Sequence, residues 1–479
     1  MIFASNTFLF LFLPLFLLVY FLAKPTWRSW IIVFGSYIFY AWWRPDFLVL
    51  FIAITYWSYW FGLLVKAQLD GGNKKQAFRF LTIGVVGNLT ALGYFKYANF
   101  GAQVLASVLE RFGLNTFTLE HIILPLGISF YVFQAISYLV DVYRRTAIPP
   151  DRFVDFAAFI ALFPQLIAGP ILRYKDMAPQ FQSRKCDLDS FSLGACRFLL
   201  GFTKKVLIAD NLAPLSTLFL SQGELQLVGA WFGLFVALIQ LYFDFSGYSD
   251  MAIGLCRMLG FRIEENFNQP YISQSITEFW MRWHMTLASF LRDYVTTPLI
   301  RRRKTGTPIA ILITMILSGF WHGAAFAFIF WGLFFGVAMI LERRFRFATT
   351  PTTPYSFRKN VTMMFFLSLS MPLFFTGNLA HSADIYTALF GLNGIGNLNN
   401  YLFGASKMSI FFCAPAILWV WLAGWNNIRF YANKRMGNET RYVMRSIKGW
   451  NMVLLWTGFL LSLTSLAANS FSPFLYFQF

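Results

Sequence analysis

Residues 308–341 read PIAILITMILSGFWHGAAFAFIFWGLFFGVAMIL and contain no Asp, Glu, Lys or Arg. A membrane-spanning helix needs about 20 apolar residues, and two stretches near this length, 307–319 and 323–341, flank a single histidine, His322. Gly319 and Gly323 bracket this histidine and permit a close backbone approach or a local kink. The pattern predicts two membrane helices that meet at a buried imidazole.

The rest of the chain has the same apolar character. Of its 479 residues, 57% are hydrophobic and 13% are charged, whereas soluble proteins carry roughly 25% charged residues. Continuous apolar runs disfavour a transmembrane β-barrel, and the hydrophobic content excludes disorder. We therefore predict an all-α polytopic membrane protein with a single domain, 1–479, and 11 or 12 crossings. The expected crossings lie at 7–23, 29–43, 47–65, 80–95, 122–140, 193–220, 227–247, 307–319, 323–341, 361–377, 405–424 and 450–468.

Positive charges collect in some loops and are missing from others. Lys24 and Arg28 follow the first apolar segment, residues 378–404 contain no Lys or Arg, and basic residues recur from Arg429 to Lys448. Because Lys and Arg favour cytoplasmic loops, we expect both termini to lie outside the cytoplasm. The net charge of +18 then reflects orientation. Nucleic-acid binding is disfavoured, because the basic residues lie between apolar segments and not on one face.

Two central stretches do not fit simple crossings. Residues 153–170 are apolar but are broken by Pro164 and by Gly169-Pro170, which suggests a hairpin that dips into the membrane. Non-helical backbone at that depth must be buried in protein or face water. Residues 264–304 are too polar to span, and we expect chemistry to concentrate there.

Within this polar stretch, SITEFWMRWHMTLASFLRDY (275–294) predicts one amphipathic helix. Ser275 and Glu278 have the spacing of a capping box. Glu278 and Arg282 are four residues apart and can pair, and His284 lies next to them. Two interpretations remain open: a helix held inside the protein, or an interfacial helix whose Trp, Arg and His side chains lie at the lipid headgroups.

His322 is the first candidate catalytic residue. Ionisable residues at membrane depth are costly and tend to be functional. Burial disfavours the charged imidazolium, and a neutral imidazole is what a general base needs to accept a hydroxyl proton. The alternative is a structural histidine that donates to a helix carbonyl. His121 and His381 lie in predicted outer loops.

A polar strip, QLYFDFSGYSD (240–250), continues an apolar helix. Its two carboxylates, Asp244 and Asp250, match no metal-binding loop and have no His or Cys nearby, so a metal site is disfavoured. Polar packing inside the helix bundle is the favoured role, and an aqueous funnel lining is the alternative. In a helix, Asp244 and Tyr248 would be close enough to bond.

Several long motifs resemble the membrane-bound O-acyltransferases, in particular the membrane subunit of alginate O-acetyltransferases. The resemblance runs through residues 1–342, and residues 343–479 match only as C-terminal transmembrane helices. The motifs are FYAWWRPDFL (39–48), LGYFKYANF (92–100), LPLGISFYVFQAISYLVDVYR (124–144), FPQLIAGPILRY (163–174), QLYFDFSGYSDMAIG (240–254), ENFNQPYISQSITEFWMRWH (265–284) and GFWHGA (319–324).

The resemblance implies a ring of helices around a funnel, with His322 as the central catalytic histidine and His284 as the second. It implies an acetyl group taken from acetyl-CoA or an acyl carrier in the cytoplasm, with no metal and no bound cofactor. The group would pass through the bacterial inner membrane, with both termini of the chain in the periplasm, to an exported polysaccharide, and periplasmic SGNH-type proteins would complete the transfer. The candidates for the funnel lining are Trp321, Trp283, Asp244, Ser246, Tyr248, Asp250, Glu278 and Arg282.

Two segments depart from the pattern of these relatives, 296–308 and 372–378. The first bears on the donor-side or partner-side surface and the second on the outer surface. Neither contains His284 or His322, so they affect the identity of the acceptor more than the expected reaction. Two alternative functions remain at this point: a transporter or flippase for a polymer or an acyl carrier, and an acyltransferase that acts on lipid or peptidoglycan. The absence of an internal repeat disfavours a transporter.

Overall fold

The computed structural model describes residues 1–167, 169–184, 186–220, 225–303, 306–398, 402, 407, 409–418, 420 and 450–468. The described residues form helices and no β-strand, which confirms the all-α prediction. The basic stretch from Arg429 to Lys448 and much of the expected crossing 405–424 lie outside the described residues.

The chain folds into two compact units. The first contains Met1–Ser192 and Leu255–Glu264, and the second contains Leu193–Gly254 and Glu265–Phe479. The prediction of one membrane domain stays a prediction.

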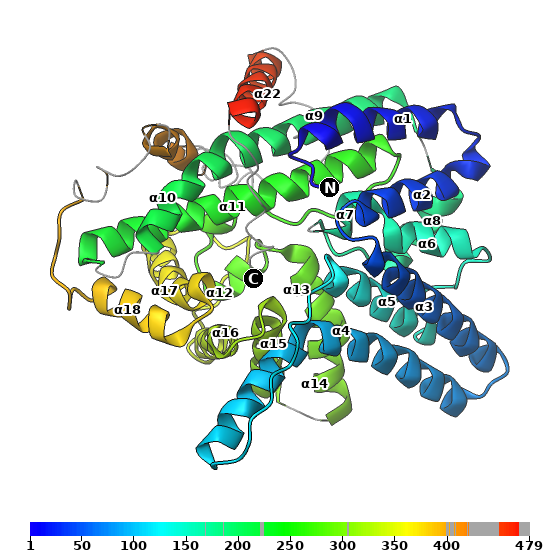
Figure 1. The fold of residues 1–479 in the computed structure, drawn as a ribbon, viewed down its shortest axis with the longest axis horizontal. Helices are drawn as coiled ribbons and strands as arrows, with labels where there is room; N and C mark the ends of the chain where they lie inside the picture. Colours follow the sequence, from blue (N-terminus) through cyan, green and yellow to red (C-terminus); the bar gives the residue numbers. More distant parts are fainter. Residues whose placement is uncertain are drawn as a thin grey trace. The chain divides into compact units, whose positions relative to one another are not determined.

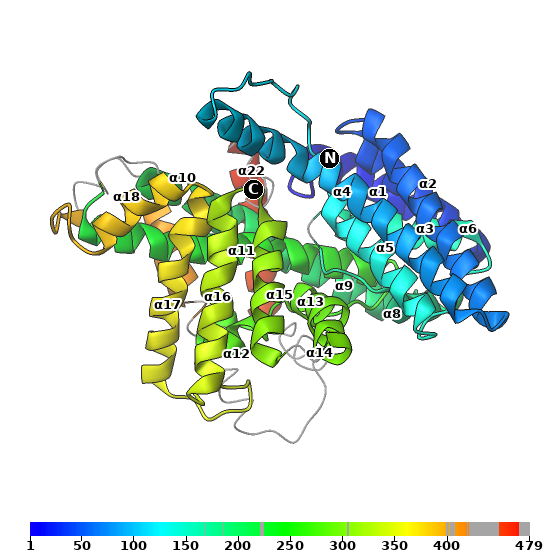
Figure 2. The same cartoon turned by 90° about the horizontal axis from the view of Figure 1, so that it is seen from below.

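The first unit is built on three long helices, α3, α4 and α5, which pack side by side (Figure 2). Tyr138 on α5 lies so close to Gly62 on α3 that a side chain at Gly62 would overlap it. The expected crossing 122–140 is wrong at its start, because Pro125 and Gly127, whose φ is 72°, precede the helix. The helices of this unit are α1 (Leu13–Leu22), α2 (Arg28–Ala41), α3 (Asp46–Asp70), α4 (Lys74–Arg111), α5 (Ile128–Tyr143), α6 (Phe153–Ala161), α7 (Phe163–Leu166) and α8 (Tyr174–Gln182).

The second unit contains both candidate histidines. In it α9 and α11 run side by side (Figure 1), with Gly201 against Gly247 and Gly194 against Gly254. Its helices are α9 (Leu188–Phe202), which begins in the first unit, α10 (Asp210–Leu220), α11 (Leu227–Met258), α12 (Ile276–Trp280), α13 (Met285–Leu291), α14 (Thr297–Arg303), α15 (Thr307–His322), α16 (Phe326–Arg344), α17 (Phe357–Thr376), α18 (Leu379–Leu389) and α22 (Trp450–Ala468).

The helices α15, α16 and α17 form consecutive neighbours in the second unit (Figure 2). Glycines bring the first two together: a Cβ at Gly319 would overlap the carbonyl oxygen of Phe328, and one at Gly332 would overlap that of Met315. The predicted close approach at Gly319 is therefore confirmed.

By length and composition, four of the described helices can cross a membrane: α3, α4, α11 and α16. Shorter apolar helices accompany them at Thr7–Leu22, Ile128–Tyr143, Thr307–His322, Ser409–Leu418 and Met452–Ala467. The expected crossing 80–95 lies within the much longer α4, and the expected crossing 193–220 consists of α9, a π-helical turn (Thr203–Ala209) and α10. The count of 11 or 12 crossings stays a prediction.

Candidate active site

His284 lies at a break between two short helices. The prediction of one continuous helix over 275–294 is wrong, because α12 ends at Trp280 and α13 begins at Met285. At the break His284 adopts a left-handed backbone, with φ 44° and ψ 52°, which costs of order 1–3 kcal/mol for a residue other than glycine. The amide of Met285 donates to the carbonyl oxygen of Asn266 at 2.9 Å and holds this turn in place. Such strained residues cluster at functional sites.

The side chain of Asn266 fixes the imidazole of His284. Its Oδ1 lies 3.0 Å from His284 Nδ1 and also accepts from the hydroxyl of Thr286 at 2.8 Å. Its Nδ2 donates to Ser249 Oγ at 3.1 Å. Because Oδ1 is an acceptor, the proton of the neutral imidazole belongs on Nδ1, which leaves the lone pair on Nε2. Nε2 is buried and has no hydrogen-bond partner among the described residues.

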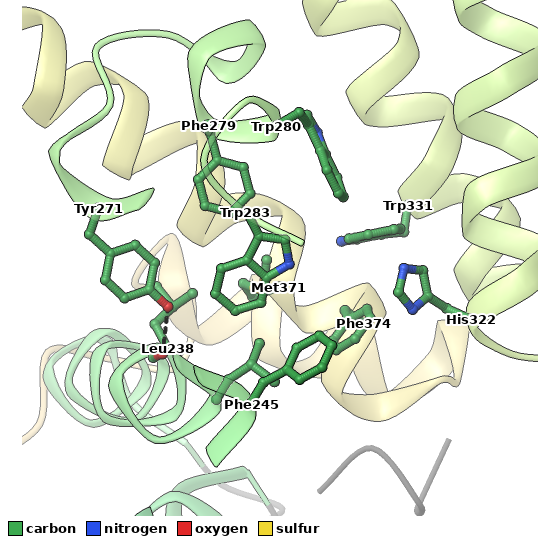
Figure 3. A pocket seen from close by; sticks show the side chains of 11 residues that line it. Leu238, Phe245, Tyr271, Phe279, Trp280, Trp283, His322, Trp331, Met371 and Phe374 are labelled. Carbon is green, nitrogen blue, oxygen red and sulfur yellow. Dashed lines mark hydrogen bonds between the residues drawn. The ribbon is translucent and has the colours of Figure 1, made fainter. Parts of the chain in front are cut away.

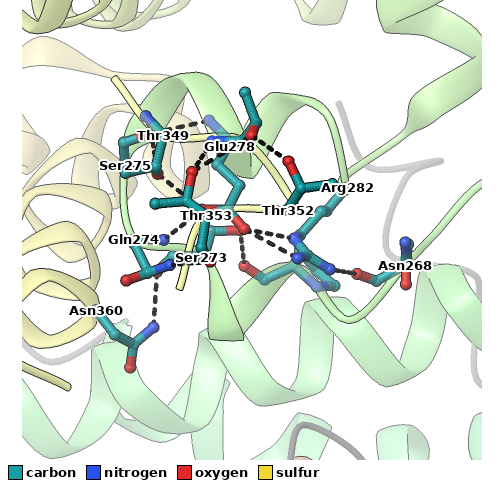
Figure 4. Close-up of polar contacts among 12 residues, drawn as sticks. Asn268, Ser273, Gln274, Ser275, Glu278, Arg282, Thr349, Thr352, Thr353 and Asn360 are labelled. Carbon is teal, nitrogen blue, oxygen red and sulfur yellow. Dashed lines mark hydrogen bonds and ion pairs between the residues drawn. The ribbon is translucent and has the colours of Figure 1, made fainter. Parts of the chain in front are cut away.

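A buried ion pair lies next to this turn (Figure 4). Glu278 Oε1 accepts from Arg282 Nε at 2.9 Å, and the two side chains are only 2% and 3% exposed. The predicted pairing is confirmed. Glu278 Oε2 accepts from Thr349 Oγ1 at 2.7 Å and from the amide of Gln274 at 3.1 Å. The burial of Glu278, Arg282 and His284 favours the helix held inside the protein over the interfacial alternative.

Two acceptors satisfy the free amides at the start of α12. Ser275 Oγ accepts from the amide of Glu278 at 3.1 Å, as predicted, although the Glu278 carboxylate bonds to Gln274 and not back to Ser275. Glu342, near the end of α16, accepts from the amides of Ile276 at 2.6 Å and Thr277 at 2.9 Å. Free helix amides need such partners, so α16 holds the start of α12 in place.

His322 is the last residue of α15 and is buried. Gly323 follows in an extended conformation and ends the helix, and a Cβ there would overlap the Phe328 ring. The imidazole packs edge to face against Trp331, with centroids 5.1 Å apart, and against Phe374 at 5.4 Å. The glycine-bracketed break is therefore present as predicted.

His322 lines a cavity of about 20 Å³, which is roughly the space of one water molecule. Figure 3 shows the imidazole on one side of this cavity and three indole rings around it. The walls come from α11, α12 and the turn after it, α15, α16 and α17. The lining residues are Leu238, Leu241, Phe245, Tyr271, Phe279, Trp280, Trp283, His322, Trp331, Met371 and Phe374.

Of the candidate funnel residues, Trp283 lines this cavity. Trp321 contacts both histidine rings, with centroids 4.8 Å from His322 and 6.3 Å from His284. The other candidate site residues do not line the cavity and are buried in the surrounding protein. They are Trp321, His284, Asp244, Ser246, Tyr248, Asp250, Glu278 and Arg282.

The carboxylates of the polar strip pair with cations from the preceding segment. Asp244 lies 2.7 Å from Lys205 Nζ, and Asp250 lies 2.6 Å from Lys204 Nζ and 2.6 Å from Arg197 Nη2. These two carboxylates therefore have the role that the sequence favoured, which is polar packing inside the helix bundle.

The three cations and Asn266 were not among the residues predicted from the sequence. Lys204 and Lys205 interrupt an otherwise apolar segment, and this was a usable signal, because an ionisable residue at membrane depth needs a partner. Asn266 gave no such signal: it lies 18 residues before His284, far beyond the spacings of three or four residues at which helix neighbours meet, and only the folded turn brings the two together.

Comparison with known proteins places these features in a family. The model of the membrane-bound O-acyltransferase family matches residues 150–380, which include His284 and His322. A protein of Pseudomonas putida named as a probable alginate O-acetylase is 44% identical over the full length of both chains. The chain belongs to the membrane-bound O-acyltransferase family. It is therefore an acyltransferase and a multi-pass membrane protein, and the resemblance to the alginate O-acetyltransferase type is confirmed.

Two further relatives show the range of this membrane-bound O-acyltransferase group. A protein of Azotobacter vinelandii, also named as a probable alginate O-acetylase, is 43% identical over the full length of both chains. A peptidoglycan O-acetyltransferase of Helicobacter pylori is 33% identical over 82% of this chain and 81% of its own. The relatives therefore support acyl transfer over the alternative of a transporter.

Proposed function

We propose that this acyltransferase takes an acetyl group from a cytoplasmic thioester, acetyl-CoA or an acyl carrier, for O-acetylation of an exported polysaccharide of the alginate class. Full-length identity of 44% and 43% to proteins named as probable alginate O-acetylases supports the acceptor class. The observation that carries the chemistry is His322, buried at the end of α15 in the wall of an aromatic cavity.

In the proposed step His322 is the general base. The hydroxyl oxygen of the acceptor attacks the thioester carbonyl carbon, a C–O bond forms, and the hydroxyl proton passes to His322. The carbonyl electron pair moves onto oxygen and then returns, the C–S bond breaks, and the leaving thiolate takes the proton from the imidazolium. The products are an ester and a free thiol.

His284 supports this centre. Its Nε2 lone pair can accept a proton or a hydroxyl hydrogen bond, because Asn266 holds the proton on Nδ1. Trp321, in contact with both imidazoles, provides the packing between the two sites.

The proposal also includes sidedness and partners. The distribution of Lys and Arg supports donor entry from the cytoplasm and an inner-membrane location with both termini in the periplasm. The acceptor polymer then lies in the periplasm, where SGNH-type acetyltransferase proteins would complete the transfer.

The experiment compares a strain expressing His322→Ala with one expressing His121→Ala, which removes an exposed imidazole from a loop of the first unit. We expect His322→Ala to abolish acetylation of the polymer at an unchanged protein level, and His121→Ala to leave it intact. Persistent acetylation in the His322→Ala strain would refute the catalytic assignment.

Peptidoglycan is the second candidate acceptor, favoured by the Helicobacter pylori relative. Mass spectrometry of the polysaccharide, peptidoglycan and lipid fractions from a deletion strain distinguishes these acceptors. Loss of acetyl groups from peptidoglycan or lipid alone would replace the alginate-class acceptor.

A further inference from the structure

The cavity beside His322 offers hydrogen-bond donors of one kind. Apart from His322 and three tryptophans, the seven other lining residues are Leu, Met, Phe or Tyr. The only hydroxyl among these seven side chains belongs to Tyr271, and it already donates to the carbonyl oxygen of Leu238 at 2.5 Å. The remaining polar groups besides His322 are the indole N–H groups of Trp280, Trp283 and Trp331. An indole N–H donates and cannot accept.

Trp331 is the best defined of these donors. Its side chain is 3% exposed, and its Nε1 is buried with no hydrogen-bond partner among the described residues. Leaving a buried donor unsatisfied costs about 1–3 kcal/mol. Phe335 at 4.9 Å and Phe374 at 5.1 Å hold the ring in place. The close-up shows the indole nitrogens of Trp331 and Trp283 pointing toward the space between the rings (Figure 3).

We propose that the indole N–H groups of Trp331 and Trp283 bind the carbonyl oxygen of the acyl group during transfer. This inference rests on the proposed function. A site that only donates suits a carbonyl oxygen, which only accepts, and suits a sugar hydroxyl poorly, because a hydroxyl also needs an acceptor. The acceptor hydroxyl accordingly meets His322, the group in the lining that can take its proton.

The two donors act when charge develops on that oxygen. As the acceptor oxygen bonds to the carbonyl carbon, the electron pair of the C=O bond moves onto the oxygen beside the indoles, and it returns when the C–S bond breaks. Fixed donors in a site without water stabilise such an oxyanion more than they stabilise the neutral carbonyl. Their loss should therefore reduce kcat more than it raises KM.

The same cavity selects the length of the acyl chain. A cavity of about 20 Å³ is small, so the shortest acyl group needs the least displacement of its walls. Trp280, Met371 and Leu238 form walls that a longer chain would have to displace. Since one methylene group changes specificity roughly 10–200-fold, we expect acetyl to be preferred over propionyl and butyryl donors.

The test uses the full-length purified protein together with the SGNH-type proteins of the proposed function, acetyl-CoA and an alginate oligosaccharide, and follows release of free thiol and ester formation. Trp331→Phe keeps a ring and removes the N–H, and should lower kcat about 10²–10³-fold with KM for the donor changed by less than about threefold. Trp57→Phe is the matched control, because its N–H donates to the carbonyl oxygen of Gly84 in the first unit. A kcat for Trp331→Phe within threefold of the wild type would overturn the assignment of the donors.

A second measurement does not depend on the folding of that variant. Met371→Ala enlarges the cavity without removing a donor, and it should raise the propionyl-to-acetyl ratio of kcat/KM at least about tenfold. An unchanged ratio would overturn the acyl placement. The wild-type protein and Trp331→Phe separate the two proposals. Absence of transfer by the wild type refutes the proposed function, whereas wild-type transfer with an unaffected Trp331→Phe refutes the indole donors alone.

Discussion

Oδ1 of Asn266 lies 3.0 Å from Nδ1 of His284 and determines which imidazole nitrogen carries the proton. Asn266 itself is held by Thr286 through the same oxygen and by Ser249 through Nδ2. The left-handed backbone of His284 turns the imidazole toward this amide. A strained residue, a fixed tautomer and a buried Nε2 therefore belong to one arrangement, in which Asn266 is a positioning residue.

Asn266→Ala should lower acetyl transfer by about tenfold or more, because loss of one hydrogen bond of about 1–1.5 kcal/mol already releases the preferred tautomer. Asn88→Ala is the control, since Asn88 is an equally buried amide that bonds to Ser58 in the first unit. Rates are compared at matched amounts of folded protein. Equal rates in the two variants would remove Asn266 from the site.

The pH profile provides an independent check on His284. Burial lowers the pKa of His284 to about 3, so the imidazole stays neutral from pH 5 to pH 8 and contributes no acidic limb near its usual value. Asn266→Asp places a carboxylate against Nδ1, which favours the imidazolium and raises the pKa of His284. Protonation then removes the Nε2 lone pair as the pH falls. We expect activity of Asn266→Asp to decline toward acidic pH well before that of the wild type, and coincident profiles would contradict the assignment.

The sequence predicted the parts of this site that depend on local pattern. The apolar stretches around His322 and the glycines beside it set the α15 and α16 helices and their close contact, because period and side-chain size are visible in the sequence. The pairing of Glu278 with Arg282 follows from a spacing of four residues. The break at His284 was missed, because helical spacing continues through 281–284 and no Gly or Pro marks the turn.

The remainder of the site depends on contacts between distant segments. Glu342 reaches the start of α12 across 65 residues, and Lys205 reaches Asp244 across 39. Only the tertiary fold brings such partners together, and a single sequence does not show which distant residues will be in contact. The aromatic cavity has the same origin, since its rings come from helices that are separated in the chain.

The buried Glu278–Arg282 pair gives a prediction for stability. Arg282→Ala leaves Glu278 buried without its cation, and breaking such a pair costs about 3–5 kcal/mol. Arg44→Ala is the comparison, because the Arg44–Asp46 pair has a shorter distance, 2.6 Å, but lies at the surface with side chains 40% and 50% exposed. In detergent, we expect a large drop in Tm for Arg282→Ala and little change for Arg44→Ala. Similar Tm values would show that Glu278 finds another partner.

The contact between α15 and α16 makes a prediction that links packing to activity. A Cβ at Gly319 would overlap the carbonyl oxygen of Phe328, whereas a Cβ at Gly93, inside α4, meets nothing within 4 Å. Gly319→Ala must therefore push α16 away from α15, at a cost of about 1–3 kcal/mol, and this movement separates Trp331 from His322. Gly93→Ala should be neutral or stabilise its helix by up to about 1 kcal/mol. Thermal unfolding and acetyl transfer are measured on both variants, and we expect Gly319→Ala to lose both stability and activity. If Gly319→Ala keeps wild-type activity, the spacing of His322 and Trp331 does not control the reaction.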